Sequence, residues 1–383
     1  MKVRTVTAGV DLDPGAMDEQ IEDAGNFLSS ARERFTDSGL EVQTVRLSTQ
    51  PWSDLIRSIE GEELVRTALD IERRARAAGI DYISLGPSKT PGQISLLPLL
   101  FGETTFVCAS AFLGNVATGP LENNIRAASR VTLDIAAISP DGSRNFMFSS
   151  CACCPPDIPF FPAAYHGRGG PSFTVGLENG DIVYGAAMRA SELSSFRELL
   201  SYEYSSALEK VENICQDLER DGDLQYRGID TSIAPGLGRD GSVALSIEKL
   251  TGSPFGSHGT LSAAATITSS LPDLGVKSCG YSGLMLPVME DDRLAECADM
   301  GSLDLQKLLL YSSVCGTGLD AVPIPGNTSI ERISGVLRDV AHLSIRWGKP
   351  LSARLLPIPN RIAGEMTNIH SPYLRNCSVI SVI

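Results

Sequence analysis

The amino-terminal part of the chain alternates between strand-like and helix-like patterns of apolar residues. Residues 2–10 alternate between two faces, which predicts a strand. Residues 17–35 carry apolar side chains at helical spacing, and Gly39 ends that helix. A strand at 41–48, a helix near 60–78 and a strand at 81–85 come next. This β-α-β-α-β order predicts a largely parallel α/β sheet.

The rest of the chain continues the mixed pattern. We expect strands near 104–110, 131–138, 144–150, 172–177 and 181–187, then a long polar helix over 191–220 and a buried helix over 258–271. A strand-like segment at 282–288 precedes helices near 291–299 and 303–313. A last helix begins at a capping box, Thr328-x-x-Glu331, and ends at Gly348, before a strand at 353–356.

No linker, low-complexity tract or fixed-period repeat divides the sequence. We therefore expect one large α/β domain over residues 1–383, with the β-α-β units of residues 1–100 as part of it.

Composition and charge exclude several kinds of partner. The chain has 383 residues, 43% apolar and 20% charged, which is ordinary for a globular protein. Its formal net charge of −14 argues against nucleic acid and anionic membranes as partners. We find neither a membrane-spanning apolar run nor the apolar core of a signal peptide, and nine cysteines then suggest reduced thiols in a cytoplasm.

The segment YSSVCGTGLDAVPIPGNT, residues 311–328, holds the first candidate site. Gly316 and Gly318 would let another group approach the Cys315 thiol, and Asp320 follows within an apolar stretch. These features favour a nucleophilic or acidic thiol and a functional carboxylate. Cys315 could equally be a small buried core residue, and Asp320 could cap a turn.

A second candidate is the segment PAAYHGRGGP, residues 162–171. His166 would move protons, while Arg168 and the glycine amides could hold an anion. The alternative is a polar surface loop.

Acidic residues provide two further candidates. Asp230 stands beside the Ser232 hydroxyl at an expected strand end in GIDTSIAPG, and Glu290 follows a strand-like run in LPVMEDD. Both could act in acid–base chemistry or ligate a hard cation. A simple turn at Asp230 and a helix start at Glu290 are the structural alternatives.

Cofactor motifs give no support for a bound group. The cysteines of CACCPPD, Cys151, Cys153 and Cys154, lack a second Cys or His pair at zinc-site distance. The letters GLGRDG at 236–241 follow a Pro-Gly turn, with no acid at the distance of a ribose ligand. We expect no cofactor and no metal, and leave open whether a divalent cation binds near Asp230 and Glu290.

Several of these segments together resemble one family. AYHGRGG, GIDTSIAPG, GYSGLMLPVMED, SVCGTGLDAVPIPGNT and ARLLPIPNRIAGE occur in that order, and they resemble the family named "domain of unknown function 711" over about residues 100–366. That family is similar in fold to the pyruvate formate-lyase-like enzymes. The resemblance implies an α/β barrel of about ten strands with helices outside.

The resemblance also implies a common cavity for the candidate residues. It places Cys315 on a loop that enters the barrel, and Gly364 at the glycine of a radical loop. Glu365 stands where such a loop has an aromatic residue, so we predict no glycyl radical. Arg354, in a strand with apolar neighbours, needs an anion as its partner.

These observations predict an enzyme that acts on a small, polar, carboxylate-bearing metabolite. Arg354 or Arg168 would bind the carboxylate, and His166 with the carboxylates would move protons in a lyase, isomerase or hydrolase step. The alternative function is a ligand-binding regulator without turnover. We further expect a cytoplasmic homodimer, because closed two-fold dimers are the commonest oligomers.

Overall fold

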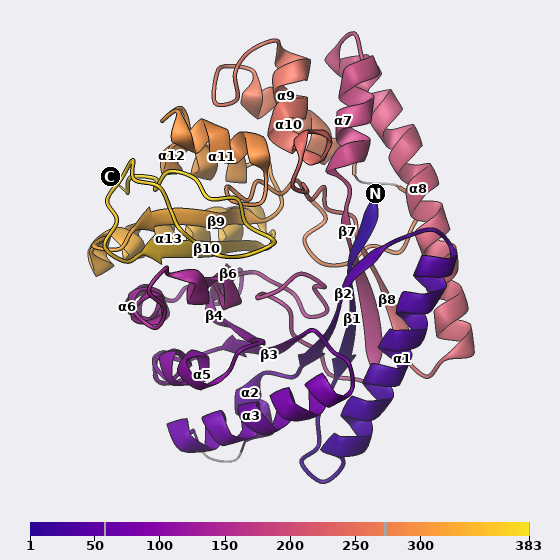
Figure 1. The fold of residues 1–383 in the computed structure, drawn as a ribbon, viewed down its shortest axis with the longest axis vertical. Coiled ribbons are helices and arrows are strands. Elements are labelled where there is room, and N and C mark those ends of the chain that lie inside the picture. Colours follow the sequence, from indigo (N-terminus) through magenta and orange to yellow (C-terminus); the bar gives the residue numbers. More distant parts are fainter. Residues whose placement is uncertain (57–58, 272–273, 383) are drawn as a thin grey trace.

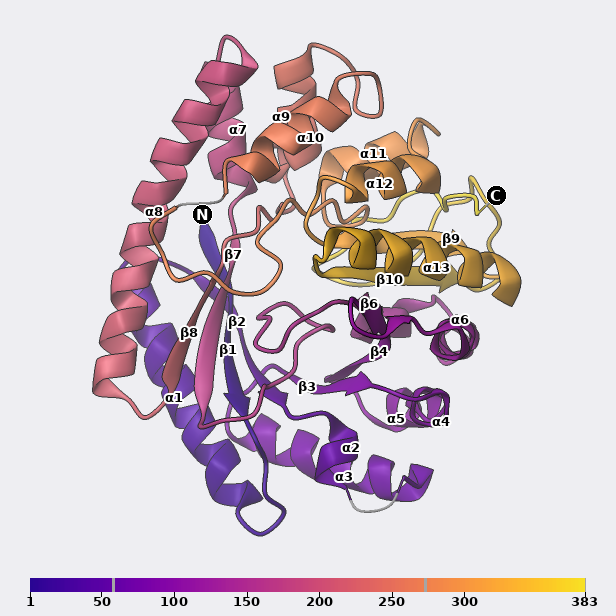
Figure 2. The ribbon, with the colours of Figure 1, turned by 180° about the vertical axis from the view of Figure 1, so that it is seen from behind.

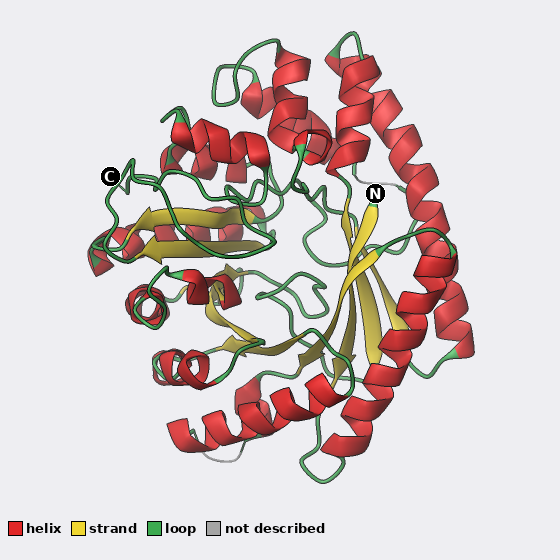
Figure 3. Ribbon diagram, viewed as in Figure 1, coloured by secondary structure: helices red, strands yellow, loops and turns green. Residues whose placement is uncertain are grey.

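The computed structural model describes residues 1–56, 59–271 and 274–382. It shows a mixed sheet of ten strands that curves around the centre of the molecule, with the helices on the outside (Figures 1 and 3). The sheet order is β8-β7-β1-β2-β3-β4-β6-β10-β9, and β5 pairs with β4.

The strands are short to medium in length. They are β1 (Lys2–Val10), β2 (Val42–Thr49), β3 (Tyr82–Ser88), β4 (Val107–Asn115), β5 (Gly119–Pro120), β6 (Phe148–Ala152), β7 (Ser172–Glu178), β8 (Gln225–Asp230), β9 (Gly318–Pro325) and β10 (Leu351–Ile358).

The helices cover the outer face of the sheet. They are α1 (Met17–Asp37), α2 (Trp52–Leu55), α3 (Gly61–Ala77), α4 (Pro91–Ile94), α5 (Leu97–Glu103), α6 (Glu122–Ala136), α7 (Gly180–Arg189), α8 (Leu193–Asp221), α9 (Val243–Thr251), α10 (Thr260–Ser269), α11 (Asp292–Asp299), α12 (Leu305–Ser312) and α13 (Ile330–Trp347), with short 3₁₀ turns η1 (Ser143–Met147) and η2 (Arg239–Gly241). The searched helices include none that is long and apolar enough to cross a membrane.

Amphipathic spacing explains why the outer helices pack on the sheet. In α1, Ile21, Leu28 and Phe35 fall on one face and are almost fully buried. In α13, Ile333, Leu337 and Val340 do the same. Burial of such side chains contributes roughly 2 kcal/mol each, which fixes the helices against the strands.

Strand direction divides the sheet into two groups. Strands β1, β2, β3, β4 and β6 run parallel to one another. β7 and β8 form a parallel pair antiparallel to β1, and β9 and β10 form a parallel pair antiparallel to β6.

The two edge strands, β8 and β9, are not paired with each other. Residues 278–287 lie between them and make isolated parallel bridges to both sides: Ile229 with Ser278, Ile233 with Leu284, and Pro287 with Asp320. Strand-to-strand pairing therefore leaves the curved sheet open at this point.

A long connection between β6 and β7, residues 153–171, runs through the concave side of the sheet (Figure 2). Its residues Ile158, Phe160 and Ala163 form a second apolar cluster with Tyr281 and Met285, separate from the main core. The interior is thus filled by this connection, which we call the inner loop.

Most of the predicted elements are present, and five details differ. Segment 131–138 belongs to α6 and segment 181–187 to α7, because spacings of three and four residues bury Ile125, Ala128 and Ile135 in the first and Val183 and Ala187 in the second. Over a few residues, apolar and polar positions in these segments also alternate, and strands were predicted for this reason.

The other three differences concern the last third of the chain. Residues 282–288 form bridges but no strand, and residues 318–325, predicted as a loop, form β9. The prolines Pro323 and Pro325 are tolerated there because β9 is an edge strand. The helix α13 is capped by Ser329 instead of Thr328, since the Ser329 hydroxyl accepts from the Arg332 amide.

Candidate functional site

A pocket on the concave side of the sheet is the candidate site, and we call it the central pocket. It contains about 950 Å³ of empty space, its mouth included. Tyr82 begins β3 and Cys108 lies near the start of β4, so the pocket opens at the amino ends of these parallel strands. The inner loop supplies Phe160 and Phe161 as apolar walls.

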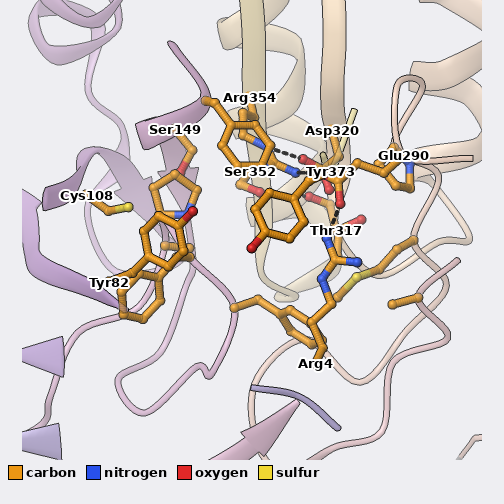
Figure 4. Close-up of a pocket in the computed structure, with 18 of the residues that line it drawn as sticks. Arg4, Tyr82, Cys108, Ser149, Glu290, Thr317, Asp320, Ser352, Arg354 and Tyr373 are labelled. Carbon is orange, nitrogen blue, oxygen red and sulfur yellow. Dashed lines mark hydrogen bonds and ion pairs between the residues drawn. The ribbon is translucent and has the colours of Figure 1, made fainter. Parts of the chain in front are cut away.

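Four charged side chains that line this pocket form an ion-pair cluster, and Glu178, outside the lining, is a further partner. Arg354 donates to Asp320 at 2.7 Å and to Glu290, and Arg4 donates to Glu290 and, at 3.1 Å, to Glu178. Figure 4 shows Asp320 and Glu290 across the pocket from Tyr82 and Cys108. Strands β1, β9 and β10 and the segment before α11 thus meet at one point.

The two carboxyl groups of the cluster differ in their tendency to ionise. Burial opposes the charge of Glu290, but Arg354 and Arg4 outweigh it and hold the pKa of Glu290 below its usual value. Burial raises the pKa of Asp320, Arg354 offsets this only in part, and the charge of Glu290 raises it further. Asp320 is therefore the member of the cluster that takes up a proton more readily.

Arg46, on β2, also lines the pocket, and among the described residues it is not paired with a carboxylate. Its Nε donates to the Thr44 hydroxyl at 2.9 Å, and its guanidinium lies 5.1 Å from the centre of the Phe161 ring. Within the described residues it makes no ion pair. Burial and the nearby Arg4 lower the pKa of Arg46 from 12.5 to about 10, so it stays charged at neutral pH. An anion in the pocket would stabilise this charge.

Two further polar side chains face the pocket without a strong partner. Thr317 is buried and, in the described part of the chain, its hydroxyl has no hydrogen-bond partner. Burial raises the pKa of Tyr82 to about 12, so its phenol stays a neutral donor. A buried hydroxyl without a hydrogen-bond partner lowers the stability of the folded protein, and a polar ligand that bonds to it would remove this cost.

Three of the residues predicted from the sequence come together in this pocket, namely Glu290, Asp320 and Arg354. The remaining ones lie elsewhere. Cys315 is 1% exposed within the main apolar core and does not line the pocket.

The two glycines beside Cys315 serve close backbone packing. A Cβ atom on Gly316 would lie 2.3 Å from the Gly283 Cα atom, and one on Gly318, at a φ of 90°, would lie 2.3 Å from the Ser352 carbonyl oxygen. Thr317, between the glycines, is the residue of this turn that lines the central pocket.

Asp230 and Ser232 organise a turn behind the pocket. The Asp230 carboxylate accepts from the Ser232 hydroxyl at 2.6 Å and from the amides of Tyr281 and Ser282. Burial raises the pKa of Asp230. Both residues are fully buried, and they fix segment 278–287 against the end of β8.

His166 and Arg168 lie away from the central pocket. His166 is buried beside the carboxyl ends of β1 and β2, where its Nδ1 atom is 3.3 Å from Asp157 and 3.4 Å from the Ser172 hydroxyl. Arg168 is exposed on the inner loop. Their proposed roles therefore have no support from proximity to Asp320 or Glu290.

Sequence reasoning missed Arg4, Arg46, Thr317, Tyr82 and Tyr373 as pocket residues. A usable signal existed for the two arginines. Arg4 follows Val3, and Arg46 lies between Val45 and Leu47, in strands where burial of an unpaired charge is costly. No local pattern marks Tyr373, which reaches the pocket from the irregular carboxy-terminal segment.

The fold and site define an α/β protein with a charged, partly apolar pocket enclosed by its sheet. The chain belongs to the family described as "Uncharacterised ACR (DUF711)", whose model matches residues 1–370. This confirms the resemblance seen in the sequence.

Relatives named UPF0210 protein match nearly the whole chain. The protein from Bifidobacterium adolescentis is 28% identical over 96% of this chain and 88% of its own length. Those from Clostridium beijerinckii and Neisseria gonorrhoeae are 27% and 25% identical, over 96% and 95% of this chain and 88% and 86% of their own lengths.

Proposed function

We propose that this protein is an enzyme that binds a small carboxylate-bearing metabolite in the central pocket and transforms it by acid–base chemistry. One observation carries the proposal. The guanidinium of Arg46, which makes no ion pair with any residue that the structure describes, shares the pocket with Asp320, a carboxyl group that is easier to protonate than usual. A lyase, isomerase or hydrolase step needs these two elements, an anchor and a proton carrier.

Arg46 binds the carboxylate in this proposal, a role that the sequence suggested for Arg354 or Arg168. Arg354 is already paired with Asp320 and Glu290, so a second anion there would meet their negative charge. Arg46 has no such competitor, and its two terminal nitrogens suit the two oxygens of a carboxylate. The rings of Phe160 and Phe161 would exclude water from this contact.

Asp320 transfers the proton. Its Oδ1 atom accepts from Arg354, and among the described residues no donor bonds its Oδ2 atom. The side chain remains partly exposed to the pocket. Glu290, held ionised by two arginines, would keep Arg354 in place while Asp320 changes its protonation.

Thiol chemistry finds less support in this pocket. Cys108 lines it, but burial raises the pKa of Cys108 to about 12, so its thiol stays protonated. Cys315 lies in the apolar core. We therefore propose acid–base chemistry without a cysteine nucleophile.

We also propose that the sheet is a barrel of the pyruvate formate-lyase type. The two groups of oppositely running strands and the bridges of residues 278–287 to both edge strands support this proposal. Gly364 lies in an exposed turn of the carboxy-terminal segment, and Tyr373 is the residue of that segment that lines the pocket.

The proposal is tested by titrating a panel of small mono- and dicarboxylic acids against the purified protein by calorimetry. The Arg46→Gln variant should bind the best acid about 30-fold more weakly, which corresponds to about 2 kcal/mol for a hydrogen bond to a charged group. Arg168→Gln, which removes an exposed arginine, is the matched control and should bind like the wild type. Equal affinity of Arg46→Gln and wild type would contradict the assignment.

A regulator that only binds its ligand is the alternative, and proton transfer distinguishes the two functions. The best acid is incubated with the protein in D₂O, and its C–H bonds are followed by nuclear magnetic resonance. An enzyme of this kind should exchange or convert the acid, and Asp320→Asn should slow this at least about 100-fold. Binding without any exchange or conversion would favour the regulator.

A further inference from the structure

A second pocket lies on the other side of the inner loop, and three cysteines line it. Cys151, Cys153 and Cys154 face it together with Tyr165, and β4 contributes the side chain of Ser110. We call it the cysteine pocket. None of its lining residues except Ala163 belongs to the central pocket.

Cys151 and Cys154 stand at the spacing of a Cys-x-x-Cys pair, and both line the cysteine pocket. Cys153, between them, adopts a φ of 52°, a conformation that side-chain-bearing residues rarely take. Its amide donates to the Gly114 carbonyl at 3.1 Å, which holds the turn. The chain thus turns at Cys153, between Cys151 and Cys154, in a backbone conformation that costs free energy. Both cysteines are free thiols.

The surroundings of the two thiols differ. The Ser149 hydroxyl lies 3.2 Å from the Cys151 sulfur atom. The buried Ser110 hydroxyl lines the same pocket as Cys151 and has no hydrogen-bond partner in the described part of the chain. Cys154 is directed to the Tyr281 hydroxyl at 3.8 Å and to the Leu351 carbonyl at 3.7 Å. Hydroxyl donors stabilise a thiolate at Cys151, whereas a carbonyl acceptor keeps a proton on Cys154.

We propose that the cysteine pocket is a thiol–disulfide exchange site, in which Cys151 attacks a small-molecule disulfide and Cys154 resolves the product. Geometry supports it in three ways: the pair spacing, the turn at Cys153 and the pocket that both cysteines line. The pKa values agree with the order of attack, since the neighbouring Cys154 lowers the pKa of Cys151, and the neighbouring Cys151 together with burial raises that of Cys154.

The exchange proceeds in two balanced steps. The Cys151 thiolate attacks one sulfur of a disulfide R–S–S–R, the S–S bond breaks, and R–S⁻ leaves with one proton taken up from the water. The Cys154 sulfur, after losing its proton, attacks the Cys151 sulfur of the mixed disulfide and expels the second R–S⁻. The protein loses two electrons and two protons, and the small disulfide becomes two thiols.

Mass spectrometry with hydroxyethyl disulfide as the probe tests this site. The full-length protein is treated with the probe, its remaining thiols are blocked with N-ethylmaleimide, and peptides are analysed. A Cys151–Cys154 disulfide is expected in the wild type. The Cys154→Ser variant should instead accumulate a mixed disulfide on Cys151, because the resolving thiol is missing.

The Cys279→Ser variant is the matched control, since Cys279 is another partly exposed thiol outside this pocket. It should form the Cys151–Cys154 disulfide at the wild-type rate. Circular dichroism before treatment shows whether each variant is folded. Addition of the probe to Cys153 alone, or no reaction at Cys151 in folded Cys154→Ser, would overturn the proposal. The readout does not depend on any ligand of the central pocket.

Discussion

Replacement of Arg46 by glutamine should stabilise the empty protein while it weakens ligand binding. Burial and Arg4 lower the pKa of Arg46 from 12.5 to about 10. The difference of about 2.5 pH units corresponds to roughly 3 kcal/mol, by which folding disfavours the charged form relative to the neutral one. Because the side chain is half-buried and solvent screens part of its charge, we expect a net gain of about 1 kcal/mol in Arg46→Gln.

The sign of this effect follows from the protonation states. The folded pKa is lowered, so the penalty is fully present wherever Arg46 is charged in both the folded and the unfolded chain, that is, below about pH 10. It is relieved only as the pH rises from about 10 towards 12.5. At neutral pH the whole effect therefore applies.

Urea unfolding at neutral pH, followed by circular dichroism, measures this gain. Arg354→Gln is the matched comparison, because it removes a second arginine from the same pocket but leaves Asp320 and Glu290 without their shared partner. Breaking a buried pair in this way costs about 3–5 kcal/mol. The two substitutions should thus shift the free energy of unfolding in opposite directions.

The reasoning would be refuted if Arg46→Gln lowered the free energy of unfolding by more than about 1 kcal/mol, as a well-paired arginine would. The same result would show that Arg46 has a partner in the folded protein and is not a free anchor for an anion. Equal destabilisation by Arg46→Gln and Arg354→Gln would lead to the same conclusion.

Three further predictions concern single residues. Glu290→Gln should lower the free energy of unfolding by about 3 kcal/mol at neutral pH; since the pKa of Glu290 is lowered, this difference should hold above about pH 4.5 and shrink as the pH falls further in a series of urea titrations. Gly316→Ala should destabilise by at least about 2 kcal/mol, because its Cβ would meet the Gly283 backbone at 2.3 Å, whereas Gly335→Ala in α13 meets nothing within 4 Å and should stabilise by about 0.5 kcal/mol in thermal melts. Cys315→Ala should cost about 1 kcal/mol of stability as a core substitution and leave acid binding by calorimetry unchanged, and a loss of binding in the folded variant would return Cys315 to the site.

The alternation of strand and helix patterns predicted most of the fold, because amphipathic spacing is a local property. The helix α1 and the strand β1 follow directly from it. The prediction of secondary structure failed where pairing with a distant strand decides the structure and the local pattern does not. β9 forms from a proline-containing segment only because β10 pairs with it, for example at Val322 with Leu355, and no local pattern contains that partner.

The candidate site was predicted in part for a similar reason. Asp320 and Arg354 were recognised because charges between apolar neighbours need partners, and Glu290 because it follows a strand-like run. Arg354 pairs with both carboxylates. Arg46 was not predicted because it lies within a strand, whereas ligands of open parallel sheets usually bind at the loops that follow the strands. Here the pocket lies at the amino ends of β3 and β4, and Arg4, Arg46 and Tyr82 line it from within strands.

The ion-pair cluster has a consequence for the order in which the protein folds during synthesis. Arg4 leaves the ribosome 286 residues before its partner Glu290. Until Glu290 follows, Glu178 is the ion-pair partner that the described residues offer to Arg4. Arg354 follows later still. The pocket is therefore a late product of translation, and shortened chains that end before Glu290 should display a partly folded sheet for chaperones to bind instead of a smaller working protein.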